Sequence, residues 1–147
     1  MTKLPLSRRS TAAKIVIDAY AWIEFFLGNK KGCKVKEILE DAEEIYTPST
    51  VIAEIARKYF REGIDLETID SRLESISVSS NVTQIDSKTA IEAAKCYIEL
   101  SENAKKHKLK SPSLFDAIVL ATGRVTESKI LTGDEHFRDL PEVVWLA

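Results

Sequence analysis

The stretch KIVIDAYAWIEFFLG, residues 14–28, decides the fold class of this chain. Its first five residues, 14–18, form a β-branched apolar run that is typical of a strand buried on both faces of a sheet. The residues that follow have the apolar spacing of a helix, and Gly28 is the residue type that commonly ends one. A buried strand that runs directly into a helix indicates an α/β fold.

The expected helix over residues 19–28 carries an apolar arc that is wider than contact with one sheet requires. Trp22, Phe25 and Phe26 dominate this arc. We therefore expect it to be covered either by a second layer of the same chain or by another subunit. The arc is a candidate dimer or partner surface, and core packing explains it equally well.

Strands and helices alternate along the rest of the chain, with Pro48 expected at the first position of a helix and Asp86 as a helix N-cap. Five short strands that alternate with helices predict a mostly parallel five-stranded sheet with right-handed crossovers. The expected strands cover residues 14–18, 45–47, 81–85, 129–132 and 143–147. The expected helices cover residues 19–28, 33–44, 48–63, 65–76, 88–107 and 113–125, and Ser111 and Pro112 are expected to start the last of them.

The composition fits one domain, because 147 residues can bury a core of their own. No apolar run approaches the roughly 18 residues of a membrane span, and the N-terminal stretch lacks the apolar part of a secretory signal. We expect a cytoplasmic protein without membrane contact. Cys33 and Cys96 match no metal or redox spacing. Residues 1–13 are expected to form a flexible basic arm, and residues 14–147 the domain.

Positive charge is concentrated locally, although the formal net charge is −2. The segment AKKHKLK, residues 104–110, contains Lys105, Lys106, Lys108 and Lys110, and a second group of cations precedes residue 15. Such clusters bind nucleic-acid phosphates through local cation density. They are equally well explained as a solvated helix end and a frayed terminus, and both interpretations stay open.

Two aspartates follow the expected strands at the point where a parallel sheet binds ligands. Asp18 ends the first strand, and Asp134 comes just after the fourth. Ligands of open parallel sheets lie beyond the carboxyl ends of the strands, where the strand order reverses. An aspartate is also a favoured helix N-cap, which explains either residue taken alone.

Two further acids lie on expected helices. Asp116, in SLFDAIVLATG, is surrounded on a helical wheel by apolar residues, so it needs either a site or a partner such as Arg57 or Arg124. Glu54 falls opposite the apolar face of its helix, which is expected to include Phe60. A solvated pair with Arg57 would explain Glu54 without any function.

If the four acids converge, their charges cannot all remain without a proton or a cation. An all-oxygen set suits Mg²⁺ or Mn²⁺. His107 and His136 stand in no metal-ligand spacing, which disfavours zinc. A carboxylate-held Mg²⁺ takes further oxygens from phosphate, so the set points to phosphoryl transfer or phosphodiester hydrolysis.

Four segments in this order resemble the PIN domain family, and especially its small VapC-like toxins: VIDAYAWIEFF, STVIAEIARK, SLFDAIVLATG and ILTGDEHF. The resemblance covers the chain from about residue 14 to its end. It implies a three-layer α/β/α fold with strand order 3-2-1-4-5. It also implies an endoribonuclease that uses one or two Mg²⁺ or Mn²⁺ ions, a homodimer, and inhibition by an antitoxin protein.

Carried over position by position, the resemblance assigns Asp18, Glu54, Asp116 and Asp134 to the family's catalytic and metal-binding acids. It assigns Thr132 to the hydroxyl residue that precedes the last acid by two. Where many relatives have Thr or Ser after the first acid, this chain has an alanine. Candidate contacts to RNA are Thr132, Arg57, Lys105, Lys106, Lys108 and Lys110.

Three alternatives remain open on the sequence. A phosphohydrolase acting through a phospho-aspartate would need a second aspartate where this chain has Tyr20. A catalytically silent PIN-like module would use the same groove to bind RNA or protein without turnover. A purely structural interpretation makes the acids helix caps and members of ion pairs.

Overall fold

The computed structural model describes residues 13–146, which form a single parallel sheet covered by helices. All four strand pairings are parallel, in the order β3-β2-β1-β4-β5, so the α/β class and the order 3-2-1-4-5 are confirmed. The expected arm over residues 1–13 lies, except for Ala13, outside the described residues. The strands are β1 (Lys14–Ile17), β2 (Glu44–Pro48), β3 (Asn81–Thr83), β4 (Lys129–Thr132) and β5 (Val143–Trp145).

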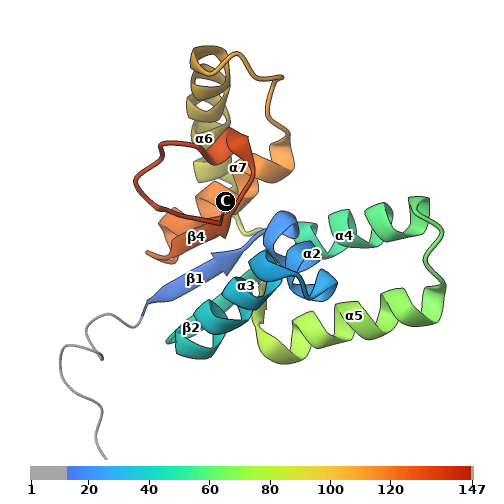
Figure 1. The fold of residues 1–147 in the computed structure, drawn as a ribbon. Helices are drawn as coiled ribbons and strands as arrows, with labels where there is room; N and C mark the ends of the chain where they lie inside the picture. The colour runs from blue at the N-terminus through green and yellow to red at the C-terminus, as the bar shows by residue number, and fades with distance from the viewer. Residues whose placement is uncertain (1–12, 147) are drawn as a thin grey trace, which may run out of the picture.

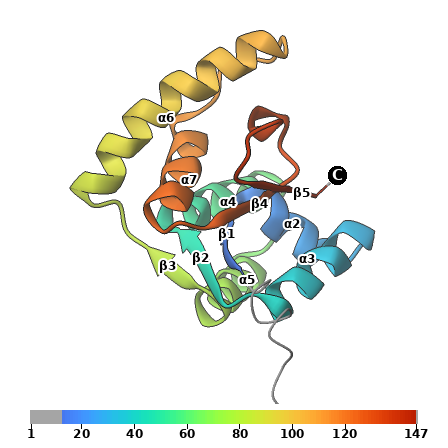
Figure 2. The ribbon, with the colours of Figure 1, turned by 90° about the vertical axis from the view of Figure 1, so that its left-hand side faces the viewer.

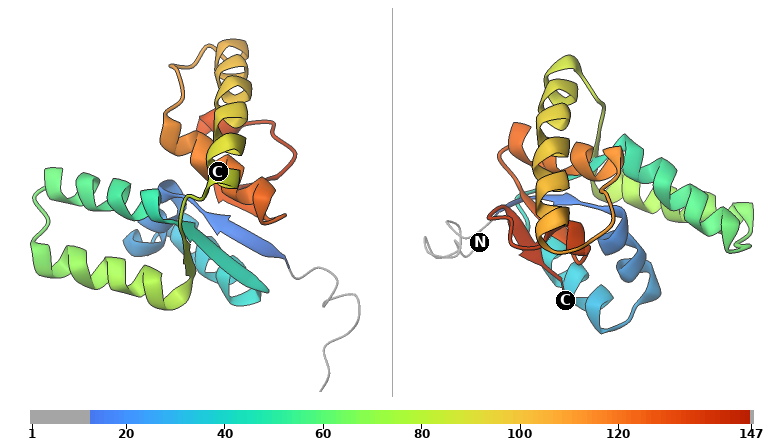
Figure 3. Two further views of the ribbon diagram at one scale, coloured as in Figure 1. Left: turned by 180° about the vertical axis from the view of Figure 1, so that it is seen from behind. Right: turned by 90° about the horizontal axis from the view of Figure 1, so that it is seen from above.

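Helices form a layer on each face of the sheet (Figures 1 and 2). α6 and α7 cover one face and α2 and α3 the other, while α4 and α5 form a pair that projects away from the sheet (Figure 3). None of the helices within residues 13–146 is long and apolar enough to span a bilayer. The helices are α2 (Ala19–Leu27), α3 (Lys30–Asp41), α4 (Ser49–Arg61), α5 (Leu66–Ser79), α6 (Ser87–Lys106), α7 (Leu114–Val125) and the 3-10 helix η1 (Glu135–Phe137).

The core is built on the two central strands, β1 and β4, which are buried on both faces as their β-branched sequences predict. α7 packs beside them with the whole run 117–123 buried. This arrangement fixes the carboxyl ends of β1 and β4 side by side, since Ile17 pairs with Leu131. The order reverses between these strands, which makes their carboxyl ends the switch point of the sheet.

The chain itself covers much of the aromatic arc of α2. Trp22 is fully buried, and its indole Nε1 donates a hydrogen bond to Thr47 Oγ1 at 3.1 Å. Phe25 and Phe26 are half-buried, and the guanidinium of Arg72 on α5 lies over the Phe26 ring at 5.8 Å from its centroid. A second layer of the same chain, rather than another subunit, therefore accounts for most of the arc.

Three local expectations are wrong. Pro48 ends β2 and precedes α4 instead of starting the helix. α3 begins three residues early, because the Asn29 side chain accepts a hydrogen bond from Gly32 N at 2.8 Å and so caps a helix from Lys30. Phe60 is 67% exposed, because the α4–α5 pair that carries it projects away from the sheet.

Candidate active site

Asp18 ends β1 and begins α2, so one residue serves both elements. Its Oδ1 accepts a hydrogen bond from Ala21 N at 2.9 Å, as a helix N-cap does, and its Oδ2 accepts one from the Thr132 hydroxyl. The side chain is buried. Burial raises the pKa of Asp18 to about 7 against the effect of these two hydrogen bonds, and the charges of Asp134 and Glu54 add to the rise.

Thr132 connects the two central strands at the switch point. It ends β4, is fully buried, and donates its hydroxyl to Asp18 while its oxygen accepts a hydrogen bond from Asp134 N at 3.0 Å. The hydroxyl thus fixes one acid through its side chain and the other through its backbone. The positions of both acids follow from the register of the parallel sheet.

Asp134 caps η1 and holds a histidine. Its Oδ1 accepts a hydrogen bond from the backbone N–H of His136 at 2.9 Å and also lies 2.9 Å from the ring nitrogen Nδ1 of His136. The other ring nitrogen, Nε2, lies 2.9 Å from the carbonyl oxygen of Lys110. Both partners are acceptors, so the ring satisfies both only as a doubly protonated imidazolium.

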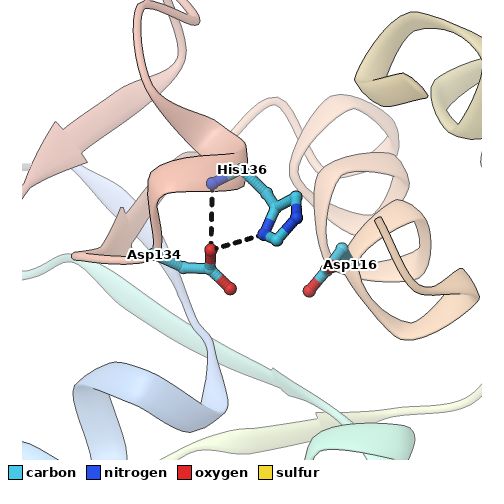
Figure 4. A group of neighbouring side chains, drawn as sticks. All are labelled: Asp116, Asp134 and His136. Carbon is cyan, nitrogen blue, oxygen red and sulfur yellow. Dashed lines mark hydrogen bonds and ion pairs between the residues drawn. The ribbon is translucent and has the colours of Figure 1, made fainter. Parts of the chain in front are cut away.

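The charges around His136 favour that cation. Burial lowers the pKa of His136, but the hydrogen bonds to Asp134 and to the Lys110 carbonyl, with the nearby charge of Asp116, outweigh burial and raise it. Figure 4 shows Asp116 facing Asp134 and His136 from α7. One ligating atom from each of these three residues lies within 4.8 Å of those from the other two.

Asp116 occupies the first turn of α7, in a capping box with Ser113: its Oδ2 accepts from Ser113 N at 2.9 Å, and its own N donates to Ser113 Oγ at 3.1 Å. Burial raises the pKa of Asp116 despite the Ser113 hydrogen bonds, and the charge of Asp134 adds to the rise. Neither suggested arginine pairs with it. Arg124 binds Glu99 at 2.6 Å and Glu142 at 2.7 Å, and Arg57 forms no ion pair within residues 13–146.

Glu54 reaches the same place from α4. It is half-buried, not solvated, and burial raises its pKa. Repulsion from Asp116 adds to the rise, as does repulsion from Asp134, while attraction by Arg57 opposes it. Glu54 therefore lies opposite the apolar face of its helix, as expected, yet within the field of two other acids. This arrangement disfavours the solvated Glu54–Arg57 pair.

The four acids thus gather around the carboxyl ends of β1 and β4, but only Asp116 and Asp134, together with His136, bring ligand atoms within 4.8 Å of one another. Asp18 and Glu54 lie outside that group and are close enough to influence the others through their charges. We call all four the acid cluster: Asp18, Glu54, Asp116 and Asp134. Each reaches the cluster from a different element, and the raised pKa values of three of them record how burial and mutual repulsion penalise their charges. Caps and cluster coexist here, so a capping role does not exclude a functional one. His136 stands in no metal-ligand spacing in the sequence, yet it binds Asp134 and belongs to the site.

The basic segment 104–110 borders the cluster. Lys110 touches His136 through its backbone carbonyl. The side chain of Asn103 donates to the carbonyl oxygens of His136 and Arg138 at 3.3 and 3.0 Å, which fixes the last turn of α6 against the residues around η1. The side chains of Lys105, Lys106, Lys108 and Lys110 are exposed.

A five-stranded parallel sheet with one buried and three half-buried acids around its switch point defines the class of this protein: an α/β protein with an acidic site at the carboxyl edge of the sheet. Residues 15–143 match the family model of the PIN domain. The chain belongs to the PIN domain family, so the resemblance drawn from its four sequence segments is confirmed. No curated protein sequence matches the chain.

Solved structures with this fold include toxin–antitoxin proteins. The chain is 15% identical to VapBC from Salmonella typhimurium bound to DNA, with a TM-score of 0.67 over 92% of this chain and 99% of that chain. A toxin–antitoxin complex from Klebsiella pneumoniae is 20% identical, with a TM-score of 0.63 over 90% and 98%. VapC20 from Mycobacterium tuberculosis, a sarcin–ricin loop cleaving toxin, is 15% identical, with a TM-score of 0.63 over 88% and 98%. At these identities the similarity is one of fold.

Proposed function

We propose that this chain is an endoribonuclease dependent on Mg²⁺ or Mn²⁺ and the toxin of a toxin–antitoxin pair. The observation that carries the proposal is the acid cluster. Four carboxylates gather around the switch point of the sheet, and within residues 13–146 the one ion pair that any of them forms is that of Asp134 with His136. A hard divalent cation is the partner that such an oxygen set fits.

The residues of the acid cluster fit a bound divalent cation. Burial raises the pKa values of Asp18, Glu54 and Asp116, so their charged forms are held at a cost that a bound cation removes. One histidine, His136, contacts the cluster through Asp134. Both ring nitrogens of His136 are taken up by Asp134 and the Lys110 carbonyl, and within the described residues no cysteine belongs to the possible ligand group, so the free donors are carboxylate oxygens, which favour Mg²⁺ or Mn²⁺ over zinc.

Each acid has a role in this proposal. Asp18, Asp116 and Asp134 hold one or two ions, and Glu54 orients the attacking water and accepts its proton. Thr132 keeps the Asp18 carboxylate facing the site. A bound ion supplies a more acidic water and stabilises charge on the scissile phosphate. In-line attack on the phosphorus then breaks the bond to the 3′ oxygen, which leaves 5′-phosphate and 3′-hydroxyl ends.

The substrate assignment rests on charge around the site. Lys110 adjoins His136, Lys105 and Lys106 lie in the last turn of α6, and Lys108 follows in the loop between them. Arg57 lies one helical turn from Glu54 and attracts it. These cations neutralise phosphates on either side of a scissile bond, which is how proteins bind RNA without reading its sequence.

Structures of the same fold support the choice of partners. VapBC from Salmonella typhimurium and the complex from Klebsiella pneumoniae are toxin–antitoxin assemblies, and VapC20 is a toxin that cleaves the sarcin–ricin loop. We expect this chain to be inhibited by an antitoxin protein and to form a homodimer. Sedimentation of the purified chain tests the dimer, and growth arrest on expression of the chain alone tests toxicity.

The decisive experiment incubates the purified chain with a panel of transfer RNAs and structured RNAs, in Mn²⁺ or in EDTA. We expect cleavage in Mn²⁺ only, abolished by Asp116→Asn and unaffected by Asp70→Asn, the same change at an exposed position of α5. Cleavage that persists in EDTA would exclude the site. RNA bound but never cleaved would support the silent module, and a trapped aspartyl phosphate would support a phosphohydrolase.

A further inference from the structure

A tyrosine lies directly against the backbone of the acid cluster. A Cβ atom placed on Gly133 would lie 2.7 Å from Tyr20 Cζ and 3.0 Å from its hydroxyl oxygen, so only glycine leaves room for this ring. Gly133 separates Thr132, which holds Asp18, from Asp134. The Tyr20 hydroxyl therefore lies at the edge of the candidate active site, on the side where α2 and α3 cover the sheet.

This hydroxyl holds a lysine in place. Lys31 Nζ donates a hydrogen bond to the Tyr20 hydroxyl at 2.8 Å and lies 5.5 Å from the centroid of the same ring. The hydrogen bond with Tyr20 raises the pKa of Lys31, so the amine stays protonated. Within residues 13–146 no carboxylate forms an ion pair with Lys31. A fixed ammonium with two donors to spare suits an incoming anion.

The surroundings of Lys31 add positive charge. A cleft of about 600 Å³ beside it is lined by three lysines and one acid. α3 begins at Lys30 and has no acid in its first turn, so two lysines stand at the positive end of the helix dipole, where cations are disfavoured. Departures of this kind from a local rule are expected at functional sites. The lining residues, which we call the lysine cleft, are Lys30, Lys31, Cys33, Lys34, Glu37 and Leu146.

Two chains of contacts connect Asp134 with two separate basic regions. On one side, Gly133 leads through Tyr20 to Lys31 and the lysine cleft. On the other side, His136 leads to Lys110 and the segment 104–110. The first region lies with α2 and α3 on one face of the sheet, and the second lies with α6 on the other (Figure 2). The acid cluster stands between them.

From this arrangement we infer that the lysine cleft binds the RNA backbone on one side of the cleaved bond, with Tyr20 positioning the Lys31 ammonium against a phosphate. The inference rests on the proposed nuclease function and specifies the path of its substrate. A strand whose scissile phosphate lies at the acid cluster continues into the lysine cleft on the α3 side. Segment 104–110 takes the strand on the other side.

The test measures RNA binding without turnover. A fluorescein-labelled single-stranded RNA of 20 nucleotides is titrated with the full chain in EDTA between 50 and 200 mM KCl. Each phosphate contact to single-stranded RNA contributes about 0.7 to the slope of log affinity against log salt. We expect Lys31→Ala to lower this slope by about 0.7, which is a factor of about 2.6 over a fourfold rise in salt.

Two variants show whether position or bulk charge matters. Lys36→Ala removes the same charge from the exposed surface of the same helix, outside the lysine cleft, and should leave the slope unchanged. Tyr20→Phe keeps the ring on Gly133 but removes the hydroxyl that holds Lys31. It should weaken RNA binding in the same direction as Lys31→Ala, by less. Calorimetric Mn²⁺ affinity should be the same in Lys31→Ala and in the unaltered chain.

Equal slopes for Lys31→Ala and Lys36→Ala would overturn the inference. So would an unchanged RNA slope together with lost binding of a poly-glutamate peptide, since the lysine cleft would then serve an acidic protein. RNA binding that depends on Lys31, in a chain that never cleaves RNA in Mn²⁺, would support the subsite and refute the nuclease proposal. RNA cleavage in Mn²⁺ together with a salt slope that does not depend on Lys31 would support the nuclease proposal and refute the subsite.

Discussion

Asp18 should make the metal-free protein less stable as the pH rises. Burial raises its pKa from 3.8 to about 7 in the folded chain. Between these two values the folded state keeps a proton that the unfolded state has lost. The free energy of unfolding therefore falls with increasing pH, and the fall ends above pH 7. From pH 5 to pH 8 about two units of this window are crossed, which amounts to roughly 3 kcal/mol.

Asp18→Asn removes this dependence while keeping the helix cap, because asparagine caps helices as well as aspartate does. We measure urea unfolding in EDTA at pH 5, 6, 7 and 8. The free energy of unfolding of the variant, relative to that of the unaltered chain, should rise by roughly 3 kcal/mol between pH 5 and pH 8. Asp86→Asn is the matched control, since Asp86 caps α6 from an exposed position and its pKa is lowered by the hydrogen bonds to Thr89. Its difference from the unaltered chain should stay constant over this range.

A constant difference between the Asp18→Asn variant and the unaltered chain would refute the reasoning, because the buried carboxyl would then titrate alike in both states. The stabilisation of the folded chain by Mn²⁺ is a second test of Asp18. At one hundred times its dissociation constant, an ion that binds only the folded state adds about 2.7 kcal/mol. We expect that gain in the unaltered chain at pH 8 and none in Asp18→Asn.

Three further changes test other contacts. His136→Gln should strengthen Mn²⁺ binding in calorimetry, because it removes the imidazolium that competes with the ion for the Asp134 carboxylate; an unchanged affinity would contradict the charge given to the ring. Thr47→Val leaves the buried indole N–H of Trp22 without an acceptor, so urea unfolding should show a loss of about 1–3 kcal/mol, with Mn²⁺ affinity unaltered; a stability equal to that of the unaltered chain would mean that the indole finds another acceptor. Gly133→Ala brings a methyl group against the Tyr20 ring and should lower the melting temperature, and Tyr20→Ala should restore part of the loss in the double variant; additive losses would show that the strain lies elsewhere.

The sequence predicts the fold and most of the acid cluster for identifiable reasons. Alternating strands and helices dictate a parallel sheet, and a parallel sheet places Asp18 and Asp134 at one edge. Asp116 stands out because apolar residues surround it. Local periodicity and the position of strand ends in a parallel sheet are sufficient to predict these three residues.

Glu54 and His136 depend on information that periodicity does not contain. Glu54 lies opposite the apolar face of α4 and would be solvated if that side of the helix faced open water. The position of α4 relative to α7 places Glu54 in the field of Asp116 instead. His136 is two residues beyond Asp134, a spacing that matches no metal motif, and only the turn of η1 brings its ring back onto the aspartate.

Phe60 shows the opposite error. It belongs to an apolar column with Ile52 and Ala56, and such a column predicts burial. The column loses its cover along the helix, since Ile52 and Ala56 are half-buried near the sheet while Phe60 is exposed at the projecting end of the α4–α5 pair. A pattern along one helix does not reveal how far the neighbouring layer extends.

Three of the four acids also hold the first turn of a helix: Asp18 for α2, Asp116 for α7 and Asp134 for η1. Evolution for foldability alone would therefore retain these aspartates in lineages that no longer cut any substrate. Glu54, in the middle of α4, has no such second duty. In a comparison of related sequences, loss of Glu54 is therefore the better sign that the proposed nuclease activity has been lost. The presence of Asp18, Asp116 and Asp134 says little about that activity.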